Sequence, residues 1–242
     1  MVPLSFANTQ LHLTPGRALY WPAQGALLVA DLHLEKASFY AQHGQMLPPY
    51  DSRETLERIA AEVAATGARR VITLGDNFHD ADGASRLDDH ACTMLEDMTG
   101  SLDWIWITGN HDSRRDGSVA EAMCGGAMVK ELELDGVVLR HQAKPGETRS
   151  EISGHFHPKL QLRVRGRRIS RPCAVVAETG DGTHRMIAPA FGALTGGMPA
   201  GDPAIIGALQ PACAIDAVVP AGGRLARFPL WRAGSGMVQA AA

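Results

Sequence analysis

Five short polar clusters, each directly after an apolar, strand-like run, constrain this chain more than any other feature. The runs are residues 26–30, 71–74, 104–108, 137–139 and 152–153, and their β-branched and apolar content predicts buried strands. The clusters are Asp31-Leu32-His33, Gly75-Asp76-Asn77-Phe78-His79, Gly109-Asn110-His111-Asp112, Arg140-His141 and Gly154-His155-Phe156-His157. Because α/β folds place their sites where strands end, we expect these side chains to meet.

The residue types in these clusters suit a pair of divalent ions. In such sites carboxylate, imidazole and amide oxygen ligands converge from several strand ends, and one carboxylate bridges ions about 3.5 to 4 Å apart. In Asp31-x-His33 and His155-x-His157 the period of two predicts that both side chains lie on one face of an extended segment. Three clusters also place a glycine before the polar residues, which permits a sharp turn or a close backbone approach. One such motif alone is more often structural, but the ordered set of five indicates a two-metal hydrolase.

In their order and spacing the five motifs resemble those of the calcineurin-like metallophosphoesterase superfamily, which run D-x-H, G-D, G-N-H-(D/E), H and G-H-x-H. Residues 31–36, 47–51, 104–112 and 189–193 are also similar to the ligase-associated DNA damage response endonuclease family called PdeM, and this similarity covers most of the chain. The resemblance implies an α/β fold: a four-layer αββα metallophosphoesterase sandwich of two mixed sheets flanked by helices.

The pattern along the chain agrees with that architecture. We expect a first hairpin over residues 18–30, a helix from a capping box of Asp51 and Glu54 to Gly67, a second helix over 85–98, and a hairpin over 131–139. The first half therefore has βαβαβ character and the second half is mainly β. The 242 residues, 45% of them hydrophobic, suffice for one core, so we expect a single domain over 1–232 and a flexible tail over 233–242.

Composition points to a soluble protein of the cytoplasm. The net charge of -3 gives no global basic field. The four cysteines are scattered without a C-x-x-C pair, which favours reduced thiols. We find no signal peptide pattern at the amino terminus and no apolar run of the roughly 18 residues that a membrane span requires.

The resemblance implies a role for each residue of the clusters. Asp31, His33 and His157 would bind the first ion, Asp76 would bridge the two ions, and Asn110, His141 and His155 would bind the second. His111 would stabilise or protonate the leaving oxygen with Asp112 orienting it, and His79 would steady the phosphate, as in SbcD-type repair nucleases. The family favours manganese, although mixed O/N ligation is also compatible with Zn, Fe or Ni.

Several residues in or beside the clusters also have structural interpretations. Arg140 stands where a glycine often precedes the motif histidine, and a lone histidine such as His141 after a strand is commonly structural. Its order between the other motifs supports ligation. Trp104 and Trp106 share one strand face and could stack bases, but we interpret them as core residues. Glu35 and Lys36 could touch the substrate or pair with each other.

A basic stretch follows the last motif. Lys159, Arg163, Arg165, Arg167, Arg168 and Arg171 lie in a segment without acidic residues. Beside a phosphoesterase site, such a ridge could hold a polynucleotide through its phosphates, and we assign substrate binding to Arg165, Arg167 and Arg168. The alternative is a solvated hairpin edge that its charges protect from association.

The sequence thus predicts a di-metal phosphodiesterase that cleaves DNA, a DNA repair endonuclease using metal-activated water. One alternative is a phosphatase or pyrophosphatase acting on nucleotides or lipid-linked sugars. The lipid A pathway pyrophosphatase UDP-diacylglucosamine hydrolase shares the Asp-Leu-His-Leu start, but its third motif typically carries arginine where this chain has His111. Another is a noncatalytic metal-binding repair scaffold. The resemblance implies association with a DNA ligase and a helicase of the same repair system, and nothing in the residues indicates an oligomeric state.

Overall fold

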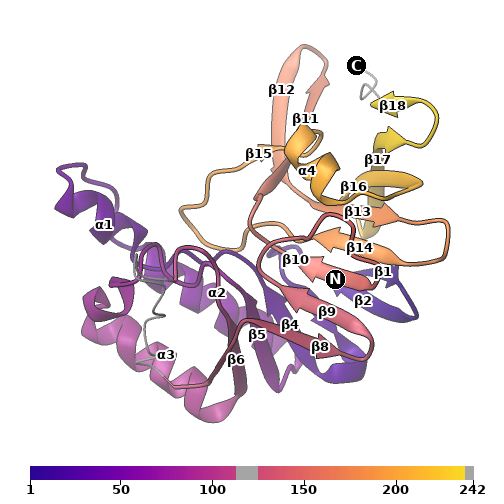
Figure 1. The fold of residues 1–242 in the computed structure, drawn as a ribbon. Coiled ribbons are helices and arrows are strands. Elements are labelled where there is room, and N and C mark those ends of the chain that lie inside the picture. Colours follow the sequence, from indigo (N-terminus) through magenta and orange to yellow (C-terminus); the bar gives the residue numbers. More distant parts are fainter. Residues whose placement is uncertain (113–124, 238–242) are drawn as a thin grey trace.

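The structure is a computed structural model in which residues 1–112 and 125–237 are described. Two large mixed sheets pack face to face (Figure 1). The first sheet contains, in spatial order, β1 (Val2–Phe6), β2 (Thr9–Leu13), β3 (Leu19–Trp21), β4 (Ala26–Val29), β5 (Arg70–Leu74), β6 (Asp103–Ile107) and β7 (Ala127–Val129). Its strands β4 to β7 are parallel, so their carboxyl ends lie at one edge.

The second sheet contains, in spatial order, β18 (Gly236–Met237), β17 (Arg224–Arg232), β16 (Ala214–Ala221), β13 (Ala174–Glu178), β14 (His184–Ile187), β10 (Ser150–Ser153), β9 (Val137–Arg140) and β8 (Glu131–Leu134). Strands β9, β10 and β14 are parallel. A small third sheet consists of β12 (Arg167–Pro172), β11 (Pro158–Val164) and β15 (Met198–Pro199). The β11–β12 hairpin rises from the body of the molecule (Figure 1).

Helices cover the outer faces. The helices are α1 (Lys36–Gln42), α2 (Asp51–Thr66), α3 (Asp89–Ser101) and α4 (Pro203–Ala208), with 3-10 turns η1 (Pro22–Gln24) and η2 (Gly83–Arg86). Because side chains alternate along a strand, Leu28 and Ile72 point between the sheets, whereas Leu27 and Val71 pack under α2 and α3. The outer face of the second sheet is covered by α4 and the small sheet. The predicted four-layer sandwich is confirmed, with a thin fourth layer.

Most predicted elements are present. The parallel register of β4, β5 and β6 with α2 and α3 between them is the expected βαβαβ unit, and β8 and β9 form the expected hairpin. Trp104 and Trp106 are buried against the helix layer, which confirms that they are core residues. A β1–β2 hairpin precedes the one expected to open the fold, and its signal was the alternation of Val2, Leu4 and Phe6, all buried.

The predicted capping box of the first helix and the predicted start of the second are wrong. The Asp51 carboxylate accepts the backbone N–H of Ala37 at 3.0 Å, so it joins α1 to α2 and forms no capping box. Helix α3 begins at Asp89 and not at residue 85. The Asp88 side chain caps it by accepting the Ala91 N–H at 2.7 Å, and the residues before it form the 3-10 turn η2.

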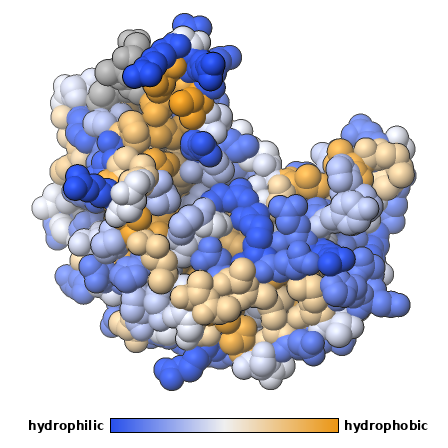
Figure 2. Space-filling model, turned by 180° about the vertical axis from the view of Figure 1, so that it is seen from behind, coloured by the Kyte–Doolittle hydropathy of each residue, from blue (hydrophilic) through white to orange (hydrophobic). Residues whose placement is uncertain are grey.

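The carboxyl-terminal segment continues the second sheet as far as β18, which pairs with β17. The remainder of the expected tail, residues 238–242, lies outside the described residues. Among the described residues no helix is long and apolar enough to cross a membrane. Seen from behind, the surface is hollowed between a part that contains α1 and a part that contains the β11–β12 hairpin, with hydrophilic residues along the floor (Figure 2).

Candidate metal centre

Most of the predicted ligands lie in an unusual backbone conformation. Positive φ angles occur at Asp31 (54°), His33 (46°), Asp76 (49°), His155 (74°) and His157 (47°). A non-glycine residue with positive φ is uncommon and costs about 1–3 kcal/mol, so such residues persist where surrounding contacts enforce them. We expected Asp31 and His33, and likewise His155 and His157, to lie in extended segments, and these angles show that the expectation is wrong. The paired side chains still reach one site because alternate residues are left-handed.

Two glycines permit the strand ends to approach one another. Gly75 has a φ of 81°, and a Cβ at this position would overlap the ring of His141. A Cβ at Gly109 would overlap the backbone nitrogen and Oδ1 of Asp76. The role expected for glycine at these motifs, close approach of the backbone, is confirmed at both positions.

The first cluster consists of Asp31, His33 and His157, whose candidate ligand atoms all lie within 4.8 Å of one another. The Nε2 atoms of His33 and His157 are 3.3 Å apart, and His157 Nε2 lies 3.5 Å from Asp31 Oδ1. Asp31 is fully buried, and both its oxygens accept the backbone N–H of His155, at 2.9 and 3.1 Å. The loop after β10 is therefore fastened to the loop after β4.

The second cluster consists of Asp76, His141 and His155, with Asn110 beside it. His141 Nε2 lies 3.3 Å from Asp76 Oδ1, 3.0 Å from His155 Nδ1 and 2.8 Å from Asn110 Oδ1. The other ring nitrogen, His141 Nδ1, lies 3.0 Å from the carbonyl oxygen of Leu74. If that nitrogen carries the proton, the lone pair of Nε2 faces the cluster, the usual arrangement of a metal-binding histidine.

Asp76 joins the two clusters. Its Oδ1 faces His141 Nε2 at 3.3 Å, and its Oδ2 lies 3.8 Å from His33 Nε2. Each oxygen of one buried carboxylate thus faces a different cluster, as a bridging ligand would. All seven predicted ligands are brought together.

The protonation of the imidazoles also suits metal binding. Burial, followed by the charges of His157 and His111, lowers the pKa of His33 to about 2. Burial and the neighbouring His141 lower the pKa of His155. The imidazoles, together with the two buried carboxylates of Asp31 and Asp76, form a donor set that fits a pair of divalent cations.

His111 and His79 lie at the side of this centre. The His111 ring is held by its Nδ1, which lies 2.7 Å from the carbonyl oxygen of His79, and its Nε2 is 4.0 Å from Asp76 Oδ2. The two rings stack, with centroids 5.3 Å apart and planes at 23°. His79 Nδ1 lies 3.5 Å from His33 Nδ1, and burial, followed by the charge of Lys36, lowers the pKa of His79 to about 4. The His111 side chain is 39% exposed, so substrate can reach it.

The expectation that Asp112 orients His111 needs correction. The Asp112 carboxylate accepts the backbone N–H groups of Gly109, Asn77 and Phe78 at 2.7, 2.9 and 3.1 Å, and also the Asn77 side-chain amide at 2.9 Å. Asp112 therefore ties the second and third motifs together. The carbonyl of His79 orients His111 in its place.

Arg140, which replaces the expected glycine, has a structural role that the motifs did not reveal. Its side chain lies 2.9 Å from Glu151 and 2.9 Å from Glu147. Glu151 also pairs with Arg185 at 2.8 Å, and all three of Arg140, Glu151 and Arg185 are buried. This Glu151 cluster (Arg140, Glu151 and Arg185) fixes the end of β9, and so the position of His141.

Glu35 and Lys36 do not pair with each other in the contacts of the described residues. Ser52 Oγ donates to Glu35 Oε1 at 2.7 Å, and the Glu35 backbone N–H donates to Ser52 Oγ at 2.8 Å. Lys36 begins α1 half-buried, and its charge contributes to the lowered pKa of His33 and of His79. Lys36 is therefore a cation beside the centre that the sequence left undecided.

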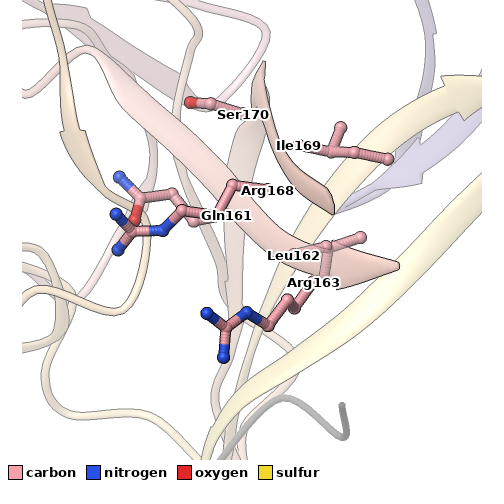
Figure 3. Close-up of a pocket in the computed structure, with 6 residues that line it drawn as sticks. All are labelled: Gln161, Leu162, Arg163, Arg168, Ile169 and Ser170. Carbon is pink, nitrogen blue, oxygen red and sulfur yellow. The ribbon is translucent and has the colours of Figure 1, made fainter. Parts of the chain in front are cut away.

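The basic stretch forms the β11–β12 hairpin, with Arg165 in its two-residue turn. Arg163 pairs directly across the strands with Arg168, and both lie on one side of the hairpin, away from Leu162 and Ile169 (Figure 3). Arg167 is the next residue along β12 and therefore points to the opposite face. The three arginines assigned to substrate binding do not share a face, and the better-matched pair is Arg163 with Arg168.

The fold and the clusters define the class: a metallophosphoesterase-like sandwich whose strand ends carry groups that could bind metal ions. Among solved structures, the chain is similar to the crystal structure of Pseudomonas putida nuclease MPE, with 30% sequence identity and a TM-score of 0.67. The similarity covers 93% of this chain and 98% of that one. The chain therefore belongs to the family of this nuclease. No protein-family model matches it, and no curated protein does.

Proposed function

We propose that this protein is a di-metal phosphodiesterase that cleaves DNA, a repair endonuclease of the PdeM type. The observation that carries the proposal is Asp76, whose two oxygens face different clusters of imidazoles. The family relationship to Pseudomonas putida nuclease MPE supports a nucleic acid substrate. The ligase and helicase partners and the preference for manganese rest on the resemblance in the motifs.

Bound divalent ions would supply charge neutralisation and a water molecule of lowered pKa. The protein's own groups supply the rest. With its Nδ1 held by the His79 carbonyl, His111 presents Nε2 toward the centre and can deliver a proton to the leaving oxygen. His79, stacked beside it and close to Lys36, is placed to contact the phosphate. Asp112 keeps the two motif loops in register.

The presence of His111 favours this function over the alternatives. A pyrophosphatase of lipid-linked sugars typically has arginine at this position, and a scaffold would need no oriented, partly exposed imidazole beside the ligands. The β11–β12 hairpin would contact the DNA backbone through Arg163 and Arg168 on one face, with Arg165 and Arg167 elsewhere on it.

Four substrates test this proposal. The purified full-length chain, with manganese added, is incubated with circular DNA, single-stranded DNA, a simple aryl phosphodiester and an aryl phosphomonoester. We expect cleavage of the DNA and of the diester, with the Asp76→Asn protein as the inactive control. Rapid hydrolysis of the monoester without cleavage of DNA would reject the nuclease and support a phosphatase.

A further inference from the structure

A cavity lined by three arginines borders the loops that carry the first metal cluster. This cavity of about 870 Å³ is lined by Arg17, Arg58 and Arg171, together with Glu54. Arg17 belongs to the turn between β2 and β3, Arg58 lies on α2 and Arg171 lies on β12. We call this cavity the arginine pocket. Its three cations come from separate parts of the sequence, so no motif predicts it.

The arginines of this pocket are only partly compensated by acidic neighbours: the charge of Glu54 acts on Arg17 and Arg58, and that of Glu62 acts on Arg58. Within residues 1–112 and 125–237, none of the three forms an ion pair. Arg17 Nη2 donates to the carbonyl of Phe191 at 3.2 Å, and Arg58 Nη2 donates to that of Gly16 at 3.0 Å. A guanidinium has five N–H donors, so most of those on each remain for solvent or a ligand.

Two of these cations are also close together and partly buried. Burial, followed by the charge of Arg58, lowers the pKa of Arg17 to about 10, while Glu54 acts in the opposite direction. The Arg58 guanidinium lies over the Phe191 ring, 4.5 Å from its centroid, which fixes its place. Half-buried like charges repel each other, and a bound anion would relieve the repulsion.

The walls of the pocket are continuous with the loops that carry the first metal cluster. The Phe191 carbonyl holds Arg17, while the Phe191 N–H donates to the Ala30 carbonyl at 2.7 Å. The next residue, Gly192, donates to the Asp31 carbonyl at 3.2 Å. On the other wall, the Cys173 N–H donates to the carbonyl of Pro158 at 3.1 Å, directly after His157.

We propose that the arginine pocket binds a phosphate of the nucleic acid strand other than the one that is cleaved. The proposal rests on the proposed nuclease function. In this proposal, a strand with its scissile phosphate at the metal clusters continues past the Asp31 and His157 loops into the pocket. Guanidinium groups match phosphate oxygens with two parallel hydrogen bonds, and this geometry positions a backbone without reading its sequence.

A binding measurement tests the proposal independently of turnover. Fluorescence anisotropy follows a labelled single-stranded oligonucleotide binding to the full chain, over a range of salt, with chelator present to prevent cleavage. The variants are Arg171→Gln, which changes an exposed side chain, and Arg58→Gln. The matched control is Arg53→Gln, an exposed arginine of α2 that pairs only with Glu57 in the described residues.

We expect each pocket variant to weaken binding about tenfold, the usual size of a lost hydrogen bond to a charged group. Each lost contact should also reduce the slope of log K against log salt by about 0.7. The control should bind as the wild type does. In manganese, the ratio of kcat/KM for DNA to that for a small diester should fall with the binding.

Two results would overturn the proposal that the arginine pocket binds a phosphate. One is unchanged DNA binding in both variants while the wild type cleaves DNA. The other is an equal loss on DNA and on the small diester, which would mean that these arginines act only by supporting the Asp31 loop. Hydrolysis of the small diester without any cleavage of DNA by the wild type would instead reject the nuclease function itself, so the two failures are distinguishable.

Discussion

Two groups of buried polar side chains lie close together in this molecule, and they differ in how their members are paired. In the Glu151 cluster, a carboxylate lies between two arginines, 2.9 Å from Arg140 and 2.8 Å from Arg185. Arg185 also donates to the carbonyls of Lys144, Ala208 and Gln210, at 2.6, 2.9 and 3.1 Å. Each arginine of this cluster is therefore paired with a carboxylate, although the Nε atoms of both are buried without a hydrogen-bond partner.

The metal centre is the opposite case. Its ring nitrogens face one another: His33 Nε2 lies 3.3 Å from His157 Nε2, and His141 Nε2 lies 3.0 Å from His155 Nδ1. Buried groups of this kind are costly unless something satisfies them. Closed pairing indicates a structural role, whereas ring nitrogens and carboxylate oxygens that converge from several loops could bind metal ions. The same distinction separates the arginine pocket from a structural ion pair.

The largest expected effect comes from Asp76→Asn. An amide keeps the shape of the side chain but removes the charge that faces both clusters. We expect hydrolysis to fall to background and the content of bound metal to fall, while the circular dichroism spectrum stays that of a folded protein. Elemental analysis and a diester assay measure these two losses. A folded variant with full manganese-dependent activity would disprove the two-metal assignment.

His111→Ala tests whether a residue at the margin of the centre is a ligand or an acid. The His111 ring is held by the His79 carbonyl with its Nε2 4.0 Å from Asp76 Oδ2, and its backbone N–H, which alanine keeps, donates to Asp76 Oδ1 at 3.0 Å. We therefore expect both ions to remain bound. Hydrolysis should slow by about 10² to 10⁴, the usual contribution of general acid catalysis. An aryl ester with a good leaving group should lose less. Loss of one metal ion from this variant would show that His111 is a ligand.

The Glu151→Gln change should lower mainly the stability of the protein, whereas the two changes in the metal centre should lower mainly its activity. Removing this charge leaves the buried Arg185 without a carboxylate partner among the described residues, while Arg140 keeps Glu147 and Glu131. Breaking a buried pair in this way costs about 3–5 kcal/mol. We expect the free energy of unfolding in urea to fall by about that amount. Glu133→Gln, which removes an exposed partner of Arg149, is the control and should change little. Similar losses of unfolding free energy in both variants would mean that the Glu151 cluster contributes no more to stability than an exposed ion pair does.

The difference between the two clusters also explains what the sequence could predict. The ligands follow apolar runs directly, so Asp76 after β5 and Asn110 after β6 are recognisable from local pattern alone. The Glu151 cluster joins β9, β10 and β14, and its members have no local signature. The arginine pocket was missed for the same reason, since only long-range packing brings its cations together.

The sequence pattern also did not predict the backbone conformation at the site or the capping of the helices. Period two correctly predicted that Asp31 and His33 serve one site, but not that both residues are left-handed. The spacing of Asp51 and Glu54 matched a capping box, yet a tertiary contact with Ala37 takes the Asp51 carboxylate. Local propensity is overridden where a distant backbone group needs an acceptor.

Added metal should stabilise the folded protein through the metal centre and should not depend on the Glu151 cluster. A ligand at 100 times its dissociation constant adds about 2.7 kcal/mol to the free energy of unfolding. We expect manganese to raise the melting temperature of the wild type and of Glu151→Gln alike, and to have little effect on Asp76→Asn. Differential scanning calorimetry with and without chelator measures the shift. An equal rise in Asp76→Asn would place the stabilising ion elsewhere.

The smallest effect is expected for charges that are exposed to solvent and form no ion pair with another described residue. Arg163 and Arg168 face each other across the hairpin and are exposed, so they cost the fold little and are free to contact phosphates. Replacing both with glutamine should leave stability within about 0.5 kcal/mol and weaken DNA cleavage a few-fold at moderate salt.

The control for this pair is Arg165→Gln with Arg167→Gln, which removes the same charge from the turn and the opposite face. If only the Arg163 and Arg168 pair matters, DNA passes along one face of the hairpin. If the two doubles lose cleavage equally, the hairpin acts through its total charge. If neither changes cleavage or the salt dependence of binding, the hairpin is a solvated edge, and DNA contacts must come from elsewhere, including the arginine pocket.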